Sequence, residues 1–263
     1  MPIIQPFTHS SRQDVAPQVL LTWVDEVFDA AASYINPLNS VEGRAGFKLV
    51  TGTYRGTPVT IVRTPLGAHG TLIALEELSR LGANVYIKVG LGCAVSPRLS
   101  VGDIVVVSSA IKGDGVSRAA APLEVPAIPD HNLTSLILEV LESNNMKYNR
   151  GMTWSTDLYY SNGLSSIDQS VYKQLAKYAL IMDPDTAALF TIGLLKKLHT
   201  AAILVVEASQ PKGVVRGELL SEEAERRDLR KRLVNGLQEA ARIAIEALTL
   251  HHEHAVRKTS RRT

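Results

Sequence analysis

Residues 51–103 carry the clearest structural pattern in the chain and read TGTYRGTPVTIVRTPLGAHGTLIALEELSRLGANVYIKVGLGCAVSPRLSVGD. The apolar runs at 58–64 and 84–92 are short and are bounded by Gly, Pro or Asn, which is typical of buried strands. Between them, leucines recur at three-residue intervals before Gly82, which predicts a helix over 70–82. A strand, a helix and a second strand in this order predict a crossover unit of an α/β sheet.

The same rhythm continues on both sides of this stretch. The sequence predicts further strands at 18–24, 103–111 and 201–209, and helices at 132–145, 185–198 and 221–250. Strands separated by crossover helices imply a parallel or mixed sheet with helices on both faces. Such sheets bind ligands at the carboxyl ends of their strands.

We expect one domain over residues 1–250, followed by a basic tail over 251–263. Residues 113–129 are rich in Ala and Pro, and because regular patterns resume on both sides, we expect a long surface connection there. The polar tail, HHEHAVRKTSRRT, is expected to be partly disordered. Its histidines could chelate a metal, but a solvated tail is the simpler interpretation, so no metal site is predicted.

The composition argues against several classes of function. Twenty-eight basic against 26 acidic residues give a net charge of +2, which favours a small-molecule substrate over nucleic acid. The one cysteine, Cys93, excludes an internal disulfide framework and a thiolate zinc site. No apolar run reaches the roughly 18 residues of a membrane helix, and the N-terminus lacks a signal-peptide pattern. A cytoplasmic protein with no membrane partner is therefore expected.

Residues 51–103 resemble the core of the hexameric class of purine and uridine phosphorylases, as do WSTDLYY at 154–160 and DPDTAALFTIG from Asp183. The resemblance covers roughly residues 14–215. It implies the nucleoside phosphorylase fold, a three-layer α/β/α arrangement with a mixed, partly barrel-like central sheet. Family members cleave the N-glycosidic bond of a nucleoside with inorganic phosphate as co-substrate and no other cofactor. The resemblance also implies a homo-oligomer built from dimers, such as a hexamer.

The first phosphate-binding element that the resemblance implies is altered in this chain. Family members place a Gly-Asp-Pro turn and an arginine after the first strand, and the matching residues here are Trp23, Asp25 and Val27. Tryptophan stands where glycine lets the backbone approach the anion, and valine stands where the arginine would be. A carboxylate at Asp25 would repel phosphate.

Two further phosphate elements are better kept. The family's Arg-x-Gly-Thr matches Lys88-Val89-Gly90-Leu91, in which lysine keeps the charge without bidentate geometry and leucine removes a hydroxyl donor. An arginine that the neighbouring subunit donates is matched by Arg44, which could also be an ordinary surface residue. The resemblance thus implies Lys88, Gly90 and Arg44 as phosphate-binding residues.

Ribose binding in the family uses a Glu-Met-Glu stretch, which is matched here by Asp183, Pro184 and Asp185. The acids are kept but are one methylene shorter, and both could instead cap the helix that follows. In the segment from Ser155 to Tyr160, Tyr159 matches the aromatic residue that stacks on the base, although it could simply fill the core. Asp157 and Gly92 are the other candidates for the base site.

Leaving-group assistance is the least conventional part of the implied site. Purine members carry a Ser-Asp pair after the last strand, where this chain has Glu207-Ala208. Glu207 is therefore the candidate catalytic acid, or else a salt-bridge partner. Uridine members also lack that aspartate, but they carry an arginine where this chain has Gln210 and a Gln-x-Arg element that is not found in 161–178.

Two functions fit these residues. The first is phosphorolysis of a nucleoside, with pyrimidines such as uridine favoured because the purine-specific carboxylate is absent. The second is a catalytically silent paralogue that binds nucleoside or serves as an assembly subunit and donates Arg44 to an intact partner in a hetero-oligomer. The altered residues are those a subunit would use in its own site, whereas the arginine given to a neighbour is present.

Overall fold

A computed structural model describes residues 4–158, 174–215 and 224–260. Its elements, in chain order, are η1 (Arg12–Asp14), β1 (Gln18–Thr22), α1 (Asp25–Tyr34), β2 (Asn36–Glu42), β3 (Lys48–Tyr54), β4 (Thr57–Arg63), α2 (Ala68–Arg80), β5 (Val85–Ala94), β6 (Ile104–Gly113), α3 (Gly115–Ala120), α4 (His131–Ser143), β7 (Asn149–Thr156), β8 (Ala179–Asp183), α6 (Thr186–Lys196), β9 (His199–Ser209) and α7 (Ala224–Ser260).

The strands of the described residues form one mixed sheet in the order β2-β3-β4-β1-β5-β8-β7-β6-β9. Strand β9 also pairs in parallel with β5, so β5, β8, β7, β6 and β9 close into a barrel-like ring. Strands β1 and β4 run parallel beside this ring, and β3 and β2 extend the sheet in antiparallel pairs. The partly barrel-like sheet expected from the sequence is confirmed.

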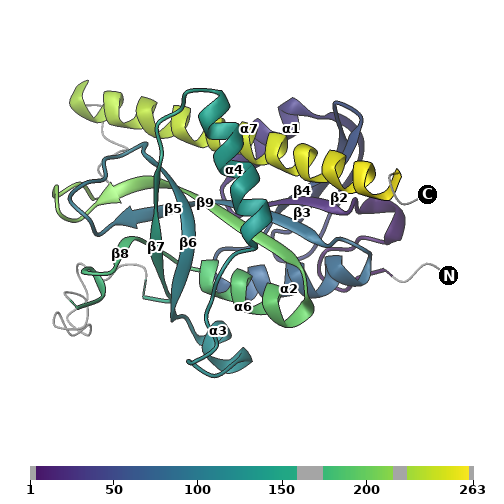
Figure 1. Cartoon of the computed structure of the whole chain (residues 1–263), viewed down its shortest axis with the longest axis horizontal. Helices are drawn as coiled ribbons and strands as arrows, with labels where there is room; N and C mark the ends of the chain where they lie inside the picture. The colour runs from purple at the N-terminus through teal and green to yellow at the C-terminus, as the bar shows by residue number, and fades with distance from the viewer. Residues whose placement is uncertain (1–3, 159–173, 216–223, 261–263) are drawn as a thin grey trace.

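Helices cover both faces of this sheet, as Figure 1 shows, with α1, α4 and α7 on one side and α2, α3 and α6 on the other. The core under the first group contains Val27 and Ile137, packed with the buried face of α7. The core under the second group contains Leu75 and Leu78 of α2 and Phe190 of α6. The expected three-layer arrangement is confirmed. Its physical reason is that strands buried on both faces need a layer of helices on each side.

The connection at 113–129 differs from the expected surface loop because it contains helix α3. Asp114 is fully buried and caps this helix by accepting hydrogen bonds from the Ser117 amide and hydroxyl, at 2.7 and 2.5 Å. Ala110 and Ala127 also form an isolated antiparallel bridge. This segment is thus partly helical despite its alanine- and proline-rich sequence, because the buried side chain of Asp114 caps the start of α3.

The C-terminal segment also differs from expectation, because α7 continues past residue 250 to Ser260. The His251 ring packs against the ring of His199, with centroids 5.4 Å apart, and Glu253 lies 3.8 Å from Arg257 one helical turn later. These contacts extend a helix whose middle is already held by the core. No helix among the described residues is both long and apolar enough to cross a membrane.

Candidate active site

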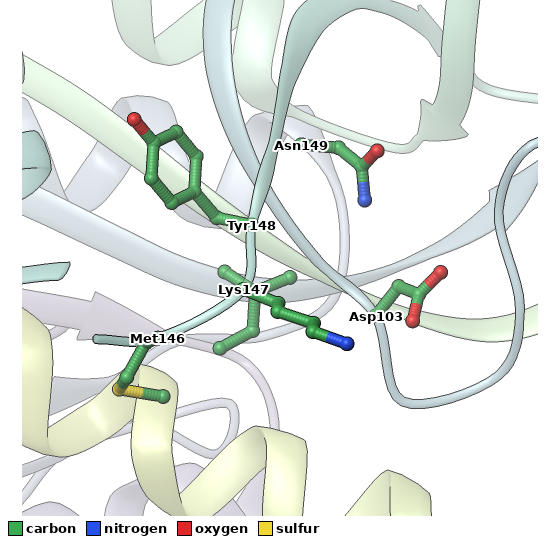
Figure 2. Close-up of a pocket in the computed structure, with 6 residues that line it drawn as sticks. Asp103, Met146, Lys147, Tyr148 and Asn149 are labelled. Carbon is green, nitrogen blue, oxygen red and sulfur yellow. The ribbon is translucent and has the colours of Figure 1, made fainter. Parts of the chain in front are cut away.

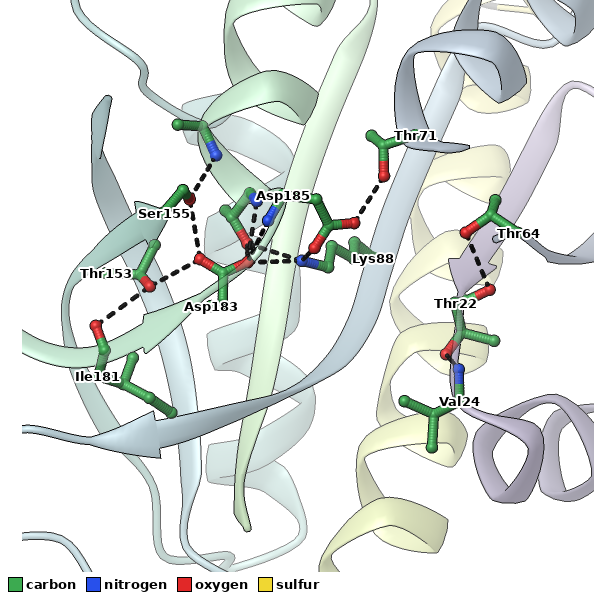
Figure 3. Close-up of polar contacts among 12 residues, drawn as sticks. Thr22, Val24, Thr64, Thr71, Lys88, Thr153, Ser155, Ile181, Asp183 and Asp185 are labelled. Atoms are coloured by element: carbon green, nitrogen blue, oxygen red, sulfur yellow. Dashed lines mark hydrogen bonds and ion pairs between the residues drawn. The ribbon is translucent and has the colours of Figure 1, made fainter. Parts of the chain in front are cut away.

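Lys88 lies between two aspartates in the interior of the protein, as Figure 3 shows. Its Nζ is 2.7 Å from Asp183 Oδ2 and also contacts Asp185 Oδ1. The exposed fractions of the three side chains are 1%, 0% and 1%. The sequence assigned these residues to two subsites, phosphate and ribose, whereas the structure joins them in one buried ion cluster.

Three elements bring the cluster together. Lys88 lies in the middle of β5, Asp183 ends β8 and Asp185 is the N-cap residue of α6. Pro184, between the two aspartates, is buried as well. Lys88 therefore comes from the strand that joins the open sheet to the ring. The two aspartates come from the end of β8, which is one of the ring strands, and from the start of the helix that follows it.

Asp183 is the most heavily hydrogen-bonded carboxylate of the cluster. Oδ1 and Oδ2 together accept from Thr153 Oγ1 (2.9 Å), Ser155 Oγ (2.8 Å), Lys88 Nζ (2.7 Å), Asp185 N (3.2 Å), Thr186 N (2.9 Å) and Thr186 Oγ1 (2.5 Å). The two amides belong to the start of α6, so Asp183 supplies the capping contact that the sequence had left as an alternative to ribose binding. Burial works to raise the pKa of Asp183, but Lys88 and these donors outweigh it and hold that pKa below its usual value.

Asp185 has fewer partners and a different titration. Its side chain makes no capping contact with α6, and Oδ2 accepts from the buried Thr71 hydroxyl of α2 at 2.6 Å. Burial raises the pKa of Asp185; Lys88 opposes this, but the neighbouring Asp183 charge adds to it, and the pKa lies above its usual value. The cluster contains one cation and two carboxylates, so Asp185 is the carboxylate that takes up a proton more readily.

The ammonium group of Lys88 has three donors, and three acceptors meet them: Asp183, Asp185 and Thr186 Oγ1, the last at 3.0 Å. Burial alone would lower the pKa of Lys88, but the two carboxylates raise it above the usual value. Breaking such a buried pair by removing one partner costs about 3–5 kcal/mol. This geometry differs from the expected one, in which the ammonium group faces phosphate.

The turn after β1 holds the first altered phosphate element. The Thr22 hydroxyl accepts from the Val24 amide at 3.0 Å, so the turn closes on itself (Figure 3). Half-buried Trp23 packs against the core, and Val27 is fully buried in it. Asp25, in the first turn of α1, forms an ion pair with Arg63 at the end of β4, with Nη2 to Oδ2 at 3.2 Å. These side chains stabilise the turn itself.

The remaining phosphate candidates lie in separate places. Gly90 lies on β5 beside Lys88, and Leu91 is buried. Arg44 lies on the exposed hairpin between β2 and β3, and its side chain has no hydrogen bond or ion pair within the described residues. Three strands, β3, β4 and β1, separate β2 from β5 in the sheet. Arg44 and Lys88 therefore lie in different parts of the folded subunit.

The leaving-group and base candidates lie at the carboxyl ends of β9, β5 and β7. Glu207 is 3% exposed and is the extra residue of a β-bulge, since Gly92 pairs with Val206 and Cys93 with Ala208. Bulges re-aim side chains and are common beside active sites. A methyl group on Gly92 would lie 2.7 Å from Ile181, so this glycine lets β8 pack against β5.

Asp157 and Tyr159 complete the predicted base site. Asp157 is exposed and accepts a hydrogen bond from the Gly115 amide at 2.8 Å, which ties the end of β7 to the start of α3. Tyr159 lies outside the described residues. Sequence reasoning did not single out the hydroxyls of Thr71, Thr153, Ser155 and Thr186. Their signal was a hydroxyl residue in an otherwise apolar strand or helix start, which is a common and weak pattern.

A cavity of about 450 Å³ lies elsewhere, lined by Asp103, Ile104 and residues 146–149 (Figure 2). It is at the amino ends of β6 and β7, whereas Ser155 and the ion cluster are at the carboxyl end of β7. The described residues contain no group of three or more His, Cys, Asp or Glu side chains arranged to hold a metal ion.

Comparisons with known proteins agree with this fold. The model of the phosphorylase superfamily matches residues 19–249. The chain is 29% identical over 206 residues to a uridine phosphorylase of Thermococcus kodakarensis, covering 75% of this chain and 74% of that one. It is also 29% identical over 203 residues to a guanosine phosphorylase of Halorubrum lacusprofundi, covering 77% and 80%.

Among solved structures, the uridine phosphorylase of Vibrio fischeri ES114 superposes with a TM-score of 0.82 at 27% identity, covering 93% of this chain and 97% of that one. The family match extends over most of the chain and includes the strands and helices that form the ion cluster. The chain therefore belongs to the phosphorylase superfamily, as a member of the nucleoside phosphorylase family.

Proposed function

We propose that this protein is a nucleoside phosphorylase that favours a pyrimidine nucleoside such as uridine over purine nucleosides. The observation that carries the proposal is the acid pair Asp183 and Asp185 at the carboxyl end of β8, beside the end of β7. This is the edge at which α/β sheets bind ligands. Relatives named uridine and guanosine phosphorylase support the same chemistry.

In the proposed reaction, a phosphate oxygen forms a bond to C1′ of the ribose while the bond from C1′ to the base nitrogen breaks. The bonding electron pair leaves with the base, which then takes up a proton, and ribose 1-phosphate remains. The carboxylates stabilise the positive charge that develops on the sugar. Glu207, buried at the bulge of β9, is the candidate group that binds or protonates the departing base.

The preference for pyrimidines rests on Ala208, which takes the place of the purine members' aspartate and is 5% exposed. Without a carboxyl group at position 208, no side chain there can protonate or hydrogen-bond N7 of a departing purine. Because a relative named guanosine phosphorylase is also 29% identical, guanosine is the purine nucleoside to compare with uridine.

The test is a screen for cleavage of uridine, thymidine, guanosine, inosine and adenosine by the purified protein, with and without phosphate. We expect phosphate-dependent release of uracil from uridine and formation of ribose 1-phosphate. Asp185→Ala should lower the rate by about 10², corresponding to roughly 3 kcal/mol. Asp103→Ala, at the opposite end of β6, is the control and should change the rate little. Failure of all five nucleosides to react would contradict the proposal.

We further propose that the protein acts in the cytoplasm as a homo-oligomer built from dimers, with Arg44 of one subunit and Gly90 of its neighbour at the shared phosphate site. The exposed position of Arg44 on the β2–β3 hairpin, away from β5, supports this arrangement. Light scattering at micromolar concentration should give a mass of at least two subunits, and a monomer alone would contradict it.

A second candidate function is a silent subunit that donates Arg44 to an intact paralogue. The ion pair of Asp25 with Arg63 and the burial of Val27 favour it, because Val27 replaces the expected arginine and Asp25 already occupies the charge of Arg63. In that case the protein alone should cleave no nucleoside, and Arg44→Ala should lower the activity of a mixed assembly. Activity of the protein alone would reject this alternative.

A further inference from the structure

We propose that Lys88 and Thr71 are positioning residues that orient Asp185 toward the ribose, and that Lys88 does not bind phosphate. This inference rests on the proposed nucleoside site but assigns new roles within it. It makes Thr71 and Lys88 specificity-determining residues for the sugar.

The first support is the saturation of Lys88. Its three donors meet three acceptors, Asp183 Oδ2 at 2.7 Å, Asp185 Oδ1 and Thr186 Oγ1 at 3.0 Å. The side chain is 1% exposed, so water does not compete for these contacts. To bind phosphate, the ammonium group would have to leave two buried carboxylates without their cation.

The second support is the path of the Lys88 side chain. A methyl group on Gly90 would lie 3.0 Å from Lys88 Cε and 3.6 Å from Nζ. A contact of 3.0 Å is tighter than carbon atoms normally make, so a side chain at 90 would force the end of the lysine side chain to shift by a few tenths of an ångström. Besides its proposed place at the phosphate site, Gly90 thus leaves room for the lysine to reach the carboxylates.

The third support is the contrast between the two carboxylates. A carboxylate offers about four lone-pair sites. Asp183 already accepts from six donors of the described residues, so it has no capacity left for sugar hydroxyls. Among the described residues, Asp185 accepts from Lys88 and Thr71 only, which leaves two sites. Asp185 is therefore the carboxylate that receives the ribose hydroxyls.

The partners of Asp185 hold one oxygen each, Lys88 on Oδ1 and Thr71 on Oδ2. Together they set the rotation of the carboxylate about its own axis, and hence the direction of the remaining lone pairs. Asp185 is 1% exposed, so a sugar that binds it displaces the side chains that cover it while the two partners keep its orientation. Loss of either partner should weaken the distinction between ribose and 2′-deoxyribose.

The experiment compares Lys88→Met with wild type and measures the KM of phosphate and the KM of uridine separately. We expect the uridine KM to rise about tenfold or more, the scale of a hydrogen bond to a charged group, while the phosphate KM stays within about threefold. A rise of about tenfold in the phosphate KM with an unchanged uridine KM would overturn the proposal, because that is the signature of a phosphate ligand.

Thr71→Val keeps the size of the side chain and removes the hydroxyl, so it tests the second residue without a buried charge defect. We expect the kcat/KM ratio of uridine to 2′-deoxyuridine to fall about fivefold or more, and Thr71→Ser to restore it. An unchanged ratio in Thr71→Val would overturn the role of Thr71.

If Lys88→Met does not fold, the double variant Lys88→Met with Asp185→Asn decides the question, because it leaves the net charge of the cluster at −1, as in wild type. Titration calorimetry with inorganic phosphate should then give an affinity within about threefold of wild type, whereas a loss of about tenfold overturns the proposal. Calorimetry with phosphate and uridine also works on a protein that shows no turnover. A negative cleavage screen would therefore count against the proposed function without deciding the role of Lys88.

Discussion

The hydroxyl of Thr71 donates to Asp185 Oδ2 over 2.6 Å, although the two residues are 114 positions apart in the chain. This contact joins the first turn of α2 to the N-cap of α6, on the same face of the sheet. Together with Lys88 of β5 it fixes a carboxylate that is only 1% exposed. The stability of the fold and the proposed chemistry of the site therefore depend on the same buried contacts.

Substitution Lys88→Met should destabilise the protein strongly. It leaves Asp183 and Asp185 buried without their cation, which we expect to lower the free energy of unfolding by about 3–5 kcal/mol. Urea denaturation measures the change. Lys196→Met is the matched control, because its partner Glu76 is partly exposed and the pair should contribute about 0–1 kcal/mol. Equal destabilisation by both variants would contradict the importance of the buried cluster.

Phosphate should bind weakly to the wild-type protein and more tightly to Asp25→Asn. The substitution removes a negative charge from the turn after β1 and frees Arg63, whose Nη2 now contacts Asp25 at 3.2 Å. We expect a gain of about two- to tenfold in phosphate affinity by titration calorimetry. Glu26→Gln removes a charge from the same helical turn without freeing Arg63, and should give a smaller gain. Tight binding by wild type would show that the anion site lies elsewhere.

Stability should fall as the pH drops through the titration of His251. Burial and the nearby His199 lower the pKa of this imidazole, while Asp130 acts in the opposite direction. A histidine whose pKa is lower in the folded state binds fewer protons there, so its contribution is complete above about pH 6.5 and is lost below it.

Thermal melts between pH 5 and pH 8 measure this dependence. His251→Gln should flatten the profile on its acidic side, because glutamine does not titrate. Exposed His131, at the start of α4, offers His131→Gln as the control, which should leave the slope unchanged. The same acidic slope in wild type and His251→Gln would show that another group causes it.

Arg44→Ala should raise the KM of phosphate about tenfold or more if the proposed shared site is correct, since it removes a charged hydrogen-bond donor. Lys48→Ala is the control on the same hairpin, because Lys48 is exposed and forms an ion pair with Glu42 at 3.2 Å. If Arg44→Ala leaves the phosphate KM as unchanged as Lys48→Ala does, Arg44 is not part of the phosphate site.

Local patterns in the sequence predicted much of the fold. The apolar runs at 58–64 and 84–92 became β4 and β5, and the leucine repeat became α2, which ends close to Gly82. The hairpin of β2 and β3 was missed, because β2 lies almost wholly exposed at the sheet edge and has no alternating apolar pattern. The helical tail was missed because its polar composition gives no sign of the contact between His251 and His199.

The residue types of the candidate site, an acid pair and a lysine, could be identified from the sequence because each lies in a short segment that resembles a family motif. Their relationship could not. Lys88 meets Asp183 and Asp185 across 95 and 97 positions, and the strength of that contact comes from burial, which is a property of the packed sheet and helices. Periodicity reports which face of an element is buried, whereas the partner of a buried charge depends on which elements pack together.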